Sequence, residues 1–345
     1  MKTDSPTVIC LTPVRNEAWV IEQFLACASL WADKIILADQ RSTDSTRVLA
    51  AKFAKVTILD NDCSSYNEGY HHKLLLDAAR RLPSPRLLIA IDADEFLTPN
   101  FGSSDEWRRM LQVPPGTVIN FEWANLRPDG SKYWSPAEMM SFGFMDDGTE
   151  YEGVTVHSGR IPVPRNAPTF PLHDVKVMHY QYRDWARMES KQRWYQCMER
   201  LISPEKSAVN LYRQYHHMDA VRPSDLRDVP SWWYDGYARG GIDLRTVRKE
   251  KTYWWDREVL GLFQQHGTRS FSQLPIWDVD WKTVAERHGL ANTIATKDPR
   301  NLLERFFHRY ASLTQSFQHS WLVRRSDKVF RRLLRLQNSR RGLKV

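Results

Sequence analysis

The segment around which this sequence is best interpreted is Ile89-Ala90-Ile91-Asp92-Ala93-Asp94-Glu95-Phe96. A short apolar run leads straight into two aspartates, which is typical of a buried strand that ends in a loop at the edge of a parallel sheet. Alternate residues of an extended segment point the same way, so Asp92 and Asp94 can face one ion. Their carboxylate oxygens suit Mn²⁺ or Mg²⁺. A single Asp-x-Asp is common, however, and a helix cap beside a solvated aspartate gives the same pattern.

Strand-like and helix-like patterns alternate on the N-terminal side of this segment. Short apolar runs predict strands at Thr7–Thr12, Lys34–Asp39, Val56–Asp60 and Leu87–Ile91. Helical spacing predicts helices between them, the first capped by Asn16, the second capped by Ser42–Asp44 and the third at Gly69–Arg81. The alternation predicts an α/β fold with a mostly parallel central sheet, in which ligands bind at the carboxyl ends of the strands.

The pattern changes after this region. Short β-like runs at Val118–Trp123, Gly153–His157 and Val175–Tyr180 predict a mixed sheet with long loops, and helical spacing begins near Asp184. We therefore expect a catalytic domain over residues 1–200, with a donor half at 1–100 and an acceptor half at 101–200. A mostly helical extension at 201–320 and a basic amphipathic tail at 321–345 are expected to follow.

Two further polar segments follow predicted strands. Asp39 ends one strand, where its carboxylate can accept a hydrogen bond from a nucleobase N–H. The residues after it, Ser42–Thr46, are equally well explained as turn and cap residues. Glu17 follows the first strand and can bind a ribose hydroxyl or complement a helix dipole.

Taken together, three segments carry a resemblance to a known family. They are TPVRNE (12–17), ADQRSTDST (38–46) and IDADEFLTP (91–99). In this order and spacing they resemble the family 2 glycosyltransferases with the GT-A fold. The resemblance covers about residues 7–100 and implies a nucleotide-binding α/β sandwich. It also implies transfer of a sugar from a nucleotide-diphosphate donor, with inversion and with Mn²⁺ or Mg²⁺.

The resemblance also implies roles for individual residues. By motif, Pro13, Arg15 and Glu17 would line the nucleoside pocket, Asp39 would meet the base, Asp92 would face the ribose or the metal, and Asp94 would bind the metal. Many relatives have Asp-Gly where this chain has Gln40-Arg41. Many also have Arg-Asn where this chain has His72-Lys73, so we expect Lys73 to contact the donor and the pyrophosphate geometry to differ.

Later residues complete the predicted site. GT-A enzymes often take a further metal ligand from a His or Asp beyond the acceptor region, and His179 resembles that ligand, although a lone His at a strand end is often structural. The hydroxyl of the acceptor needs a base to remove its proton. Asp147, Glu152 and His157 are the candidates between the two aspartates and His179, and no spacing separates them.

The composition indicates where the charge lies along the chain and in which compartment the protein is expected. The net charge is +8, and residues 321–345 hold nine Lys/Arg and one Asp, so the rest of the chain is about neutral. Neither a signal peptide nor a metal-type or redox-type cysteine spacing is recognisable, which predicts a cytoplasmic protein. The tail has Leu322, Val329, Phe330, Leu333 and Leu336 on one helical face. That face either lies on an anionic membrane, at its inner surface, or docks on the protein itself.

These patterns favour an enzyme that acts on a glycan or lipid-linked acceptor, as in cell-surface polysaccharide synthesis. A nucleotidyltransferase is disfavoured because no glycine-rich loop follows the first strand, and no kinase-type phosphate loop occurs. A non-catalytic carbohydrate- or polyanion-binding protein on the same scaffold is the alternative. Nucleic acid is not an expected partner, because basic character is confined to the tail.

Overall fold

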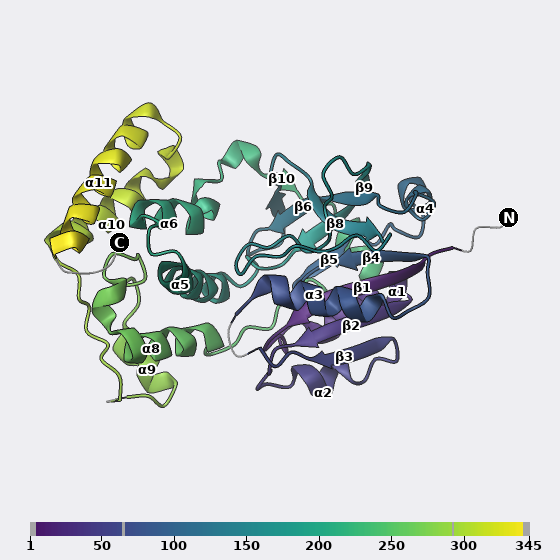
Figure 1. Ribbon diagram of the computed structural model, residues 1–345, viewed down its shortest axis with the longest axis horizontal. Helices are drawn as coiled ribbons and strands as arrows, with labels where there is room; N and C mark the ends of the chain where they lie inside the picture. Colours follow the sequence, from purple (N-terminus) through teal and green to yellow (C-terminus); the bar gives the residue numbers. More distant parts are fainter. Residues whose placement is uncertain (1–4, 64–65, 292, 341–345) are drawn as a thin grey trace. The chain divides into compact units, whose positions relative to one another are not determined.

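The structure is a computed structural model that describes residues 5–63, 66–291 and 293–340 (Figure 1). It divides into two compact units. Unit 1 contains Met1–Asp184 and Arg227–Lys249, and unit 2 contains Trp185–Leu226 and Glu250–Val345. These boundaries differ from the predicted ones, because the expected border at residue 200 falls inside a helix of unit 2 and the chain returns to unit 1 at Arg227.

Unit 1 is built on one large sheet. Its strands are β1 (Thr7–Val14), β2 (Lys34–Asp39), β3 (Val56–Asp60), β4 (Arg86–Ala90), β5 (Glu95–Leu97), β6 (Val118–Leu126), β7 (Lys132–Trp134), β8 (Met140–Met145), β9 (Thr169–His179) and β10 (Arg227–Asp228). The strand order is β10-β7-β6-β8-β4-β1-β2-β3, and β9 pairs with both β5 and β6. Strands β3, β2, β1 and β4 are parallel, whereas β8 runs antiparallel to β4. The predicted α/β fold, with a mostly parallel central sheet followed by a helical C-terminal region, is confirmed.

Helices cover both faces of the parallel strands. They are α1 (Ile21–Trp31), α2 (Thr46–Ala50) and α3 (Glu68–Ala79), with α4 (Asp105–Met110) and α7 (Trp232–Ala238) elsewhere in unit 1. Alternate strand residues face opposite layers, so Ile35 and Ile89 join the core under α1, whereas Ile36 and Leu88 join the core under α3. Both layers are almost fully buried, which explains why these strands are continuous apolar runs in the sequence.

Three local predictions in unit 1 are wrong. Ser42–Asp44 do not cap the second helix, because its N-cap residue is Ser45, whose side chain makes no cap hydrogen bond. Gly153–His157 is a loop, not a strand, and its backbone lies so close to α3 that a Cβ on Gly69 would stand 2.7 Å from the carbonyl carbon of Gly153. Asn16 does not cap a helix, because α1 begins at Ile21 and no side chain caps it. Asn16 instead adopts a positive φ of 56° and binds the loop after β2.

Unit 2 is helical. Its helices are α5 (Trp185–Ile202), α6 (Ala208–Tyr215), α8 (Trp254–His266), α9 (Trp281–Arg287), α10 (Leu302–Thr314) and α11 (Trp321–Arg340). Short 3-10 turns link several of them, and a small core of Val209, Phe307 and Phe330 joins α6, α10 and α11.

Helix α11 contains most of the predicted basic tail; residues 341–345 lie outside the described residues. Its inward face is Val323, Asp327, Phe330 and Leu334, which are all buried. Phe330 was expected on the same face as Leu322, Val329, Leu333 and Leu336, but those four side chains are 41–69% exposed. The helix thus docks on its own unit and still presents an apolar stripe to solvent. Within the described ranges, no helix combines the length and apolar character needed to cross a membrane.

Candidate active site

The loops after β1 and β2 are held together at the carboxyl edge of the sheet. The Asn16 side chain accepts a hydrogen bond from the backbone N–H of Thr43 (2.7 Å), and the Asn16 N–H donates to the Ser42 hydroxyl (2.9 Å). The Ala18 N–H donates to the Asp44 carboxylate at 3.0 Å. These contacts explain the polar residues after Asp39, because Ser42, Thr43 and Asp44 bind the loop that follows β1. The second helix begins after them, at Thr46. The edge is therefore a fixed framework.

Asp39 lies within this framework, and only one of its two carboxylate oxygens accepts hydrogen bonds there. Its Oδ2 accepts from Arg47 (2.9 Å) and from the backbone N–H of Ser42 (3.3 Å). Its Oδ1 is buried and has no hydrogen-bond partner in the described part of the chain. The side-chain Nδ2 of Asn61, at the end of the neighbouring strand β3, is likewise buried without a partner there. A buried acceptor and a buried donor without partners are each costly unless a ligand or water completes them.

Strand pairing explains how Asp94 meets His179. The loop after β4 carries Asp92 and Asp94 and runs directly into β5, whose first residue, Glu95, pairs with His179 at the end of β9. The backbone carbonyl of Asp94 accepts from the N–H of Tyr180 (2.8 Å), which anchors the loop to the end of β9. As a result, Nε2 of His179 lies 3.8 Å from Oδ2 of Asp94, too far for a hydrogen bond.

The orientation of the His179 ring is set by β6. Nδ1 of His179 lies 2.7 Å from Oδ1 of Asn125, while the Asn125 amide nitrogen lies near the carbonyls of Trp123 (3.4 Å) and Trp134 (3.5 Å). Because the amide nitrogen faces carbonyls, its oxygen faces His179, and Nδ1 is the donor. In the neutral imidazole the lone pair is then on Nε2, the ring atom that lies 3.8 Å from Oδ2 of Asp94, and a metal-ligating histidine uses its ring nitrogen in the same way. Trp123 stacks on the same ring with centroids 4.5 Å apart.

This pair fits a divalent cation as a partial ligand set. A cation bonded to both atoms at about 2.1 Å would hold them about 3 to 4 Å apart. No three His, Cys, Asp or Glu side chains form a complete metal site in the described ranges. Mg²⁺ commonly takes only one or two protein ligands and completes its shell with substrate phosphates and water. Asp94 and His179 therefore suit a cation that binds together with a phosphate ligand.

Asp92 takes part in a different interaction from the predicted one. Arg160 donates to Asp92 Oδ2 at 2.8 Å and also pairs with both oxygens of Glu95. Glu95 accepts further from the Trp123 indole N–H and from the Asp92 backbone N–H, both at 2.8 Å. The Arg160 guanidinium lies 4.8 Å from the centre of the Phe142 ring. Asp92 is thus bridged to Glu95 by a nearly buried arginine.

Charge in this cluster follows from burial and pairing. Burial raises the pKa of Glu95, and Arg160 opposes that rise. Burial acts to lower the pKa of Arg160, but Asp92 and Glu95 outweigh it and raise the pKa overall. Arg160 is therefore charged at every relevant pH, and it positions Asp92 while compensating the buried carboxylate of Glu95.

Two histidines of α3 also face this region. Burial lowers the pKa of both His71 and His72 to about 4; Arg15 adds to the effect at His71 and Arg160 at His72. Nε2 of His71 and Nδ1 of His72 have no hydrogen-bond partner among the described residues. Lys73, the residue predicted to contact the donor, is exposed and pairs with Asp77 at 3.1 Å. Its role stays a prediction, and the buried side chains at this position are His71 and His72.

The predicted base candidates lie in two different places. Asp147 follows β8, whose Met145 pairs with Leu87 near the start of β4, so it lies at the opposite edge of the sheet from Asp92. At about 3.3 Å per residue, that separation is about 20 Å, which is incompatible with a role beside Asp92. Glu152 and His157 are exposed on the loop that packs against the start of α3 and that also carries Arg160.

The remaining predicted donor residues flank the same edge. Pro13 is in β1 opposite Ala38, and Arg15 follows at the strand end, close enough to His71 to affect its charge. The Glu17 carboxylate accepts from the Trp19 indole N–H at 2.7 Å. The structure therefore brings Pro13, Arg15, Glu17, Asp39, Asp92, Asp94 and His179 to the carboxyl edge of one sheet.

Three residues of the cluster were not predicted. Glu95 follows the two aspartates in sequence, and its position three residues after Asp92 lets it accept the Asp92 N–H. Trp123 stands in a strand pattern in which any large residue is expected. Arg160 comes from an irregular loop, and no local pattern points to it.

Comparisons with known proteins add little to this geometry. No family model matches the sequence, and no curated protein matches it. Among solved structures, glucosyl-3-phosphoglycerate synthase from Mycobacterium tuberculosis, in complexes with Mn²⁺, UDP and glucosyl-3-phosphoglycerate or with Mg²⁺ and UDP, is 18% identical. The match covers 34% of this chain and 44% of that chain, with a TM-score of 0.28. A further mycobacterial protein is 16% identical over 35% of this chain and 41% of its own, with a TM-score of 0.27. The chain thus spans less than half the length of the solved structures it matches, and a similarity of this extent assigns neither family nor activity.

Proposed function

We propose that this chain is a glycosyltransferase of the GT-A, family 2 type that transfers a sugar from a nucleotide-diphosphate donor to a hydroxyl acceptor with inversion. The observation that carries the proposal is the approach of Asp94 Oδ2 and His179 Nε2 to 3.8 Å at the carboxyl edge of the sheet. A carboxylate and an oriented imidazole at this place suit a divalent cation that also binds a diphosphate.

The donor half of the proposal rests on unmet polar atoms. Oδ1 of Asp39 would accept from a nucleobase N–H, and Nδ2 of Asn61 would donate to a neighbouring acceptor of the base. Pro13, Arg15 and Glu17 would line the nucleoside side of the pocket, and Lys73 would add a contact to the donor. Asp92, held in place by Arg160, would meet the ribose or the metal.

The proposed mechanism starts from the negative charge that develops on the diphosphate leaving group. A divalent cation, Mn²⁺ or Mg²⁺, supplies neutralisation of the diphosphate as the sugar departs. Asp94 and His179 would hold the cation, and Asn125 would keep the imidazole in the tautomer that can bind it. An acceptor hydroxyl would attack the anomeric carbon from the opposite face, with Glu152 or His157, which share a loop with Arg160, accepting its proton.

A thermal-shift panel of nucleotide-diphosphate sugars, with and without Mn²⁺, tests the proposal. The matching donor should raise the melting temperature in the presence of Mn²⁺, because a ligand that binds only the folded state stabilises it. Asp94→Asn should lose that Mn²⁺-dependent shift, whereas the matched control Asp228→Asn, an exposed residue on β10, should keep it. A full shift in Asp94→Asn would contradict the proposed metal site.

The alternative is a non-catalytic carbohydrate- or polyanion-binding protein on the same scaffold. Both proteins would bind a donor or a glycan, but only the enzyme would release nucleoside diphosphate in the presence of an acceptor. Turnover of the donor identified by the panel, measured as nucleoside diphosphate released, separates the two. Donor binding without release across a range of glycan and lipid-linked acceptors would favour the binding protein.

The exposed apolar stripe on α11 bears on which acceptor the enzyme would use. We propose a glycan or lipid-linked acceptor in cell-surface polysaccharide synthesis, with α11 touching the inner face of an anionic membrane. The exposed stripe of Leu322, Val329, Leu333 and Leu336 is accompanied by the exposed cations Arg325 and Arg332, a combination typical of interfacial helices. Replacing Val329 and Leu333 by Ser should reduce co-sedimentation with anionic vesicles; unchanged co-sedimentation would contradict the contact.

A further inference from the structure

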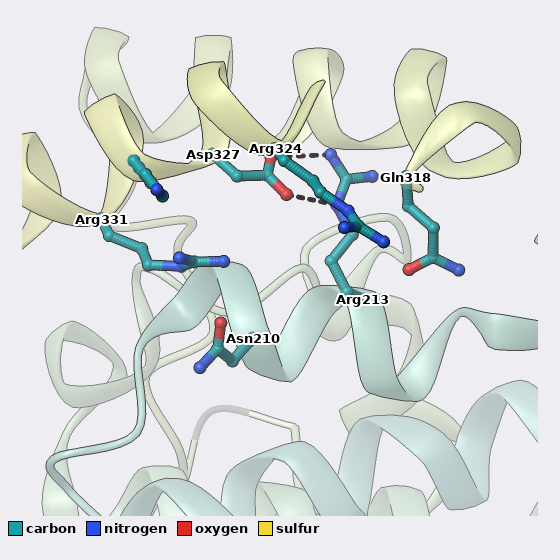
Figure 2. Close-up of a pocket in the computed structure, with 7 residues that line it drawn as sticks. Asn210, Arg213, Gln318, Arg324, Asp327 and Arg331 are labelled. Atoms are coloured by element: carbon teal, nitrogen blue, oxygen red, sulfur yellow. Dashed lines mark hydrogen bonds and ion pairs between the residues drawn. The ribbon is translucent and has the colours of Figure 1, made fainter. Parts of the chain in front are cut away.

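Unit 2 contains a cavity of its own between α6 and α11, with a volume of about 370 Å³ (Figure 2). Its lining residues are Asn210, Arg213, Gln318, Arg324, Asp327, Lys328 and Arg331. Figure 2 shows Arg324 and Arg331 extending from α11 toward the helix that carries Asn210 and Arg213. All seven side chains are polar, and four of them are cations against one carboxylate.

Arg213 and Asp327 form a closed pair that builds the cavity wall. The Arg213 guanidinium donates to both oxygens of Asp327, at 3.1 and 2.9 Å. Its remaining N–H groups donate to Ala311, Thr314 and Gln315 at 2.8–3.0 Å. Asp327 accepts in addition from the Tyr310 hydroxyl at 3.0 Å. This pair has used its hydrogen-bonding capacity and neutralises itself, so it fixes α6 against α11 and leaves the other cations uncompensated.

Arg324, Lys328 and Arg331 remain. None of the three forms an ion pair with a residue in the described ranges, although Asp327 lies on the same helix. Nε of Arg331 is buried and has no hydrogen-bond partner among those residues. Three like charges around one cavity repel each other, and a buried guanidinium N–H without an acceptor is costly. An anion placed in the cavity would relieve both penalties at once.

We propose that this cavity binds a phosphoryl group, carried either by a small soluble molecule or by a lipid headgroup. Phosphate oxygens accept several charge-assisted hydrogen bonds, and guanidinium groups match them well. Asn210 and Gln318 add neutral polar groups that can bind the rest of the ligand. The cavity volume is that of a site for a phosphorylated sugar or a similar small molecule.

This site is separate from the proposed donor site. Every lining residue belongs to unit 2, whereas Asp39, Asp94 and His179 belong to unit 1. The cation set also requires no metal, because arginine and lysine supply the charge directly. Binding here therefore goes beyond the proposed function and is measurable when metal-dependent donor binding is switched off.

Isothermal titration of the full chain with inorganic pyrophosphate, in EDTA and at constant ionic strength, tests the proposal. Arg324→Gln/Arg331→Gln should weaken binding at least about 10-fold, because each charged hydrogen bond contributes substantially to affinity. The matched control is Arg287→Gln/Arg309→Gln, which removes two exposed cations of α9 and α10 that lie in the same unit but do not line the cavity. The control should change the affinity less than about 2-fold. Should the first variant fail to fold, Lys328→Gln alone, an exposed residue, tests the same site.

The outcomes separate this site from the donor site and from diffuse charge attraction. Lys73→Gln, which removes from unit 1 an exposed cation proposed to contact the donor, should leave pyrophosphate affinity in EDTA unchanged. No measurable binding by the unchanged chain, or equal losses in the cavity variant and the control, would overturn the proposal. Sedimentation with phosphatidylcholine vesicles, with and without phosphatidic acid, then identifies the source of the phosphoryl group. A loss of sedimentation specific to the cavity variant indicates a lipid headgroup, and a loss confined to pyrophosphate indicates a soluble ligand.

Discussion

The two edges of the parallel strands in unit 1 differ in how completely their buried polar atoms are paired. At the amino edge, Asp146 accepts from Arg80 at 2.9 and 3.1 Å and from Arg86 at 2.7 and 3.0 Å, and it has no solvent-exposed side-chain surface. At the carboxyl edge, Asp39 and Asn61 each keep a buried atom with no partner in the described residues. A purely structural polar group is expected to be saturated, so these unpartnered atoms support the proposal that a ligand binds at the carboxyl edge.

The difference also appears in electrostatics. Burial acts to raise the pKa of Asp146, but Arg80 and Arg86 outweigh it and lower the pKa overall. The carboxyl edge has two histidines whose pKa is lowered mainly by burial, with Arg15 or Arg160 adding to the effect. Asp146 is compensated within the protein, whereas the unpartnered atoms of Asp39, Asn61, His71 and His72 could still gain a hydrogen bond from a ligand.

The largest expected effect is at the amino edge. Asp146→Asn should destabilise unit 1 by about 3–5 kcal/mol, because it leaves two arginines without their buried charge partner. The neighbouring exposed residue provides the control, since Asp147→Asn should stay within about 0.5 kcal/mol of the unchanged chain. Chemical denaturation measures both. Similar losses in the two variants would remove the distinction between the edges. The same control should keep full turnover, because Asp147 lies far from the site.

The second effect is a pH dependence at the carboxyl edge. His71 and His72 have a pKa near 4 when folded and an ordinary value of 6.5, so the unfolded chain binds more protons between these limits. Their contribution to stability is complete above about pH 6.5 and is lost as the pH falls toward 4, at up to about 1.4 kcal/mol per pH unit for each histidine. The difference between the unfolding free energies at pH 7 and at pH 5 should therefore be smaller in His71→Gln/His72→Gln than in the unchanged chain. The exposed control His173→Gln should keep the full pH dependence; an unchanged dependence in the double variant would contradict this account.

The smallest expected effect is on nucleotide affinity. Asp39→Asn should weaken binding of the nucleoside diphosphate about 10-fold, the effect of one hydrogen bond to a charged group, and should change stability by less than about 1 kcal/mol. Asp60 is the matched control, because it pairs with the same Arg47 at 2.8 Å but has a side chain that is 71% exposed. Equal affinity in Asp39→Asn and Asp60→Asn, measured by titration, would remove Asp39 from the donor pocket.

The strands that are continuous apolar runs were predictable from the sequence. The strands at 34–39 and 56–60 have the predicted bounds, and β4 is displaced by one residue from the predicted 87–91. The apolar runs of β2 and β4 reflect burial on both faces of the sheet, a local signal that needs no knowledge of distant residues. The aspartates at their ends could be found for the same reason.

Contacts between distant loops were not predictable. Asn16 has the sequence context of a helix cap, but its side chain is used 27 residues away at Thr43. Arg160 lies 68 residues from Asp92, in a loop without periodicity. The wrong strand at 153–157 has the same origin, because its backbone binds the start of α3 instead of a neighbouring strand. A single sequence carries no signal for such pairings when the residues between them are irregular.

The central claim is that a divalent cation binds at the carboxyl edge together with a nucleoside diphosphate. Crystals of the full chain grown with Mn²⁺ and the nucleoside diphosphate selected by the thermal-shift panel test it directly through the anomalous scattering of manganese. The account predicts an anomalous peak bonded to the Asp94 carboxylate and to Nε2 of His179. Bound nucleotide with manganese at other residues, or with no manganese between these two side chains, would contradict it.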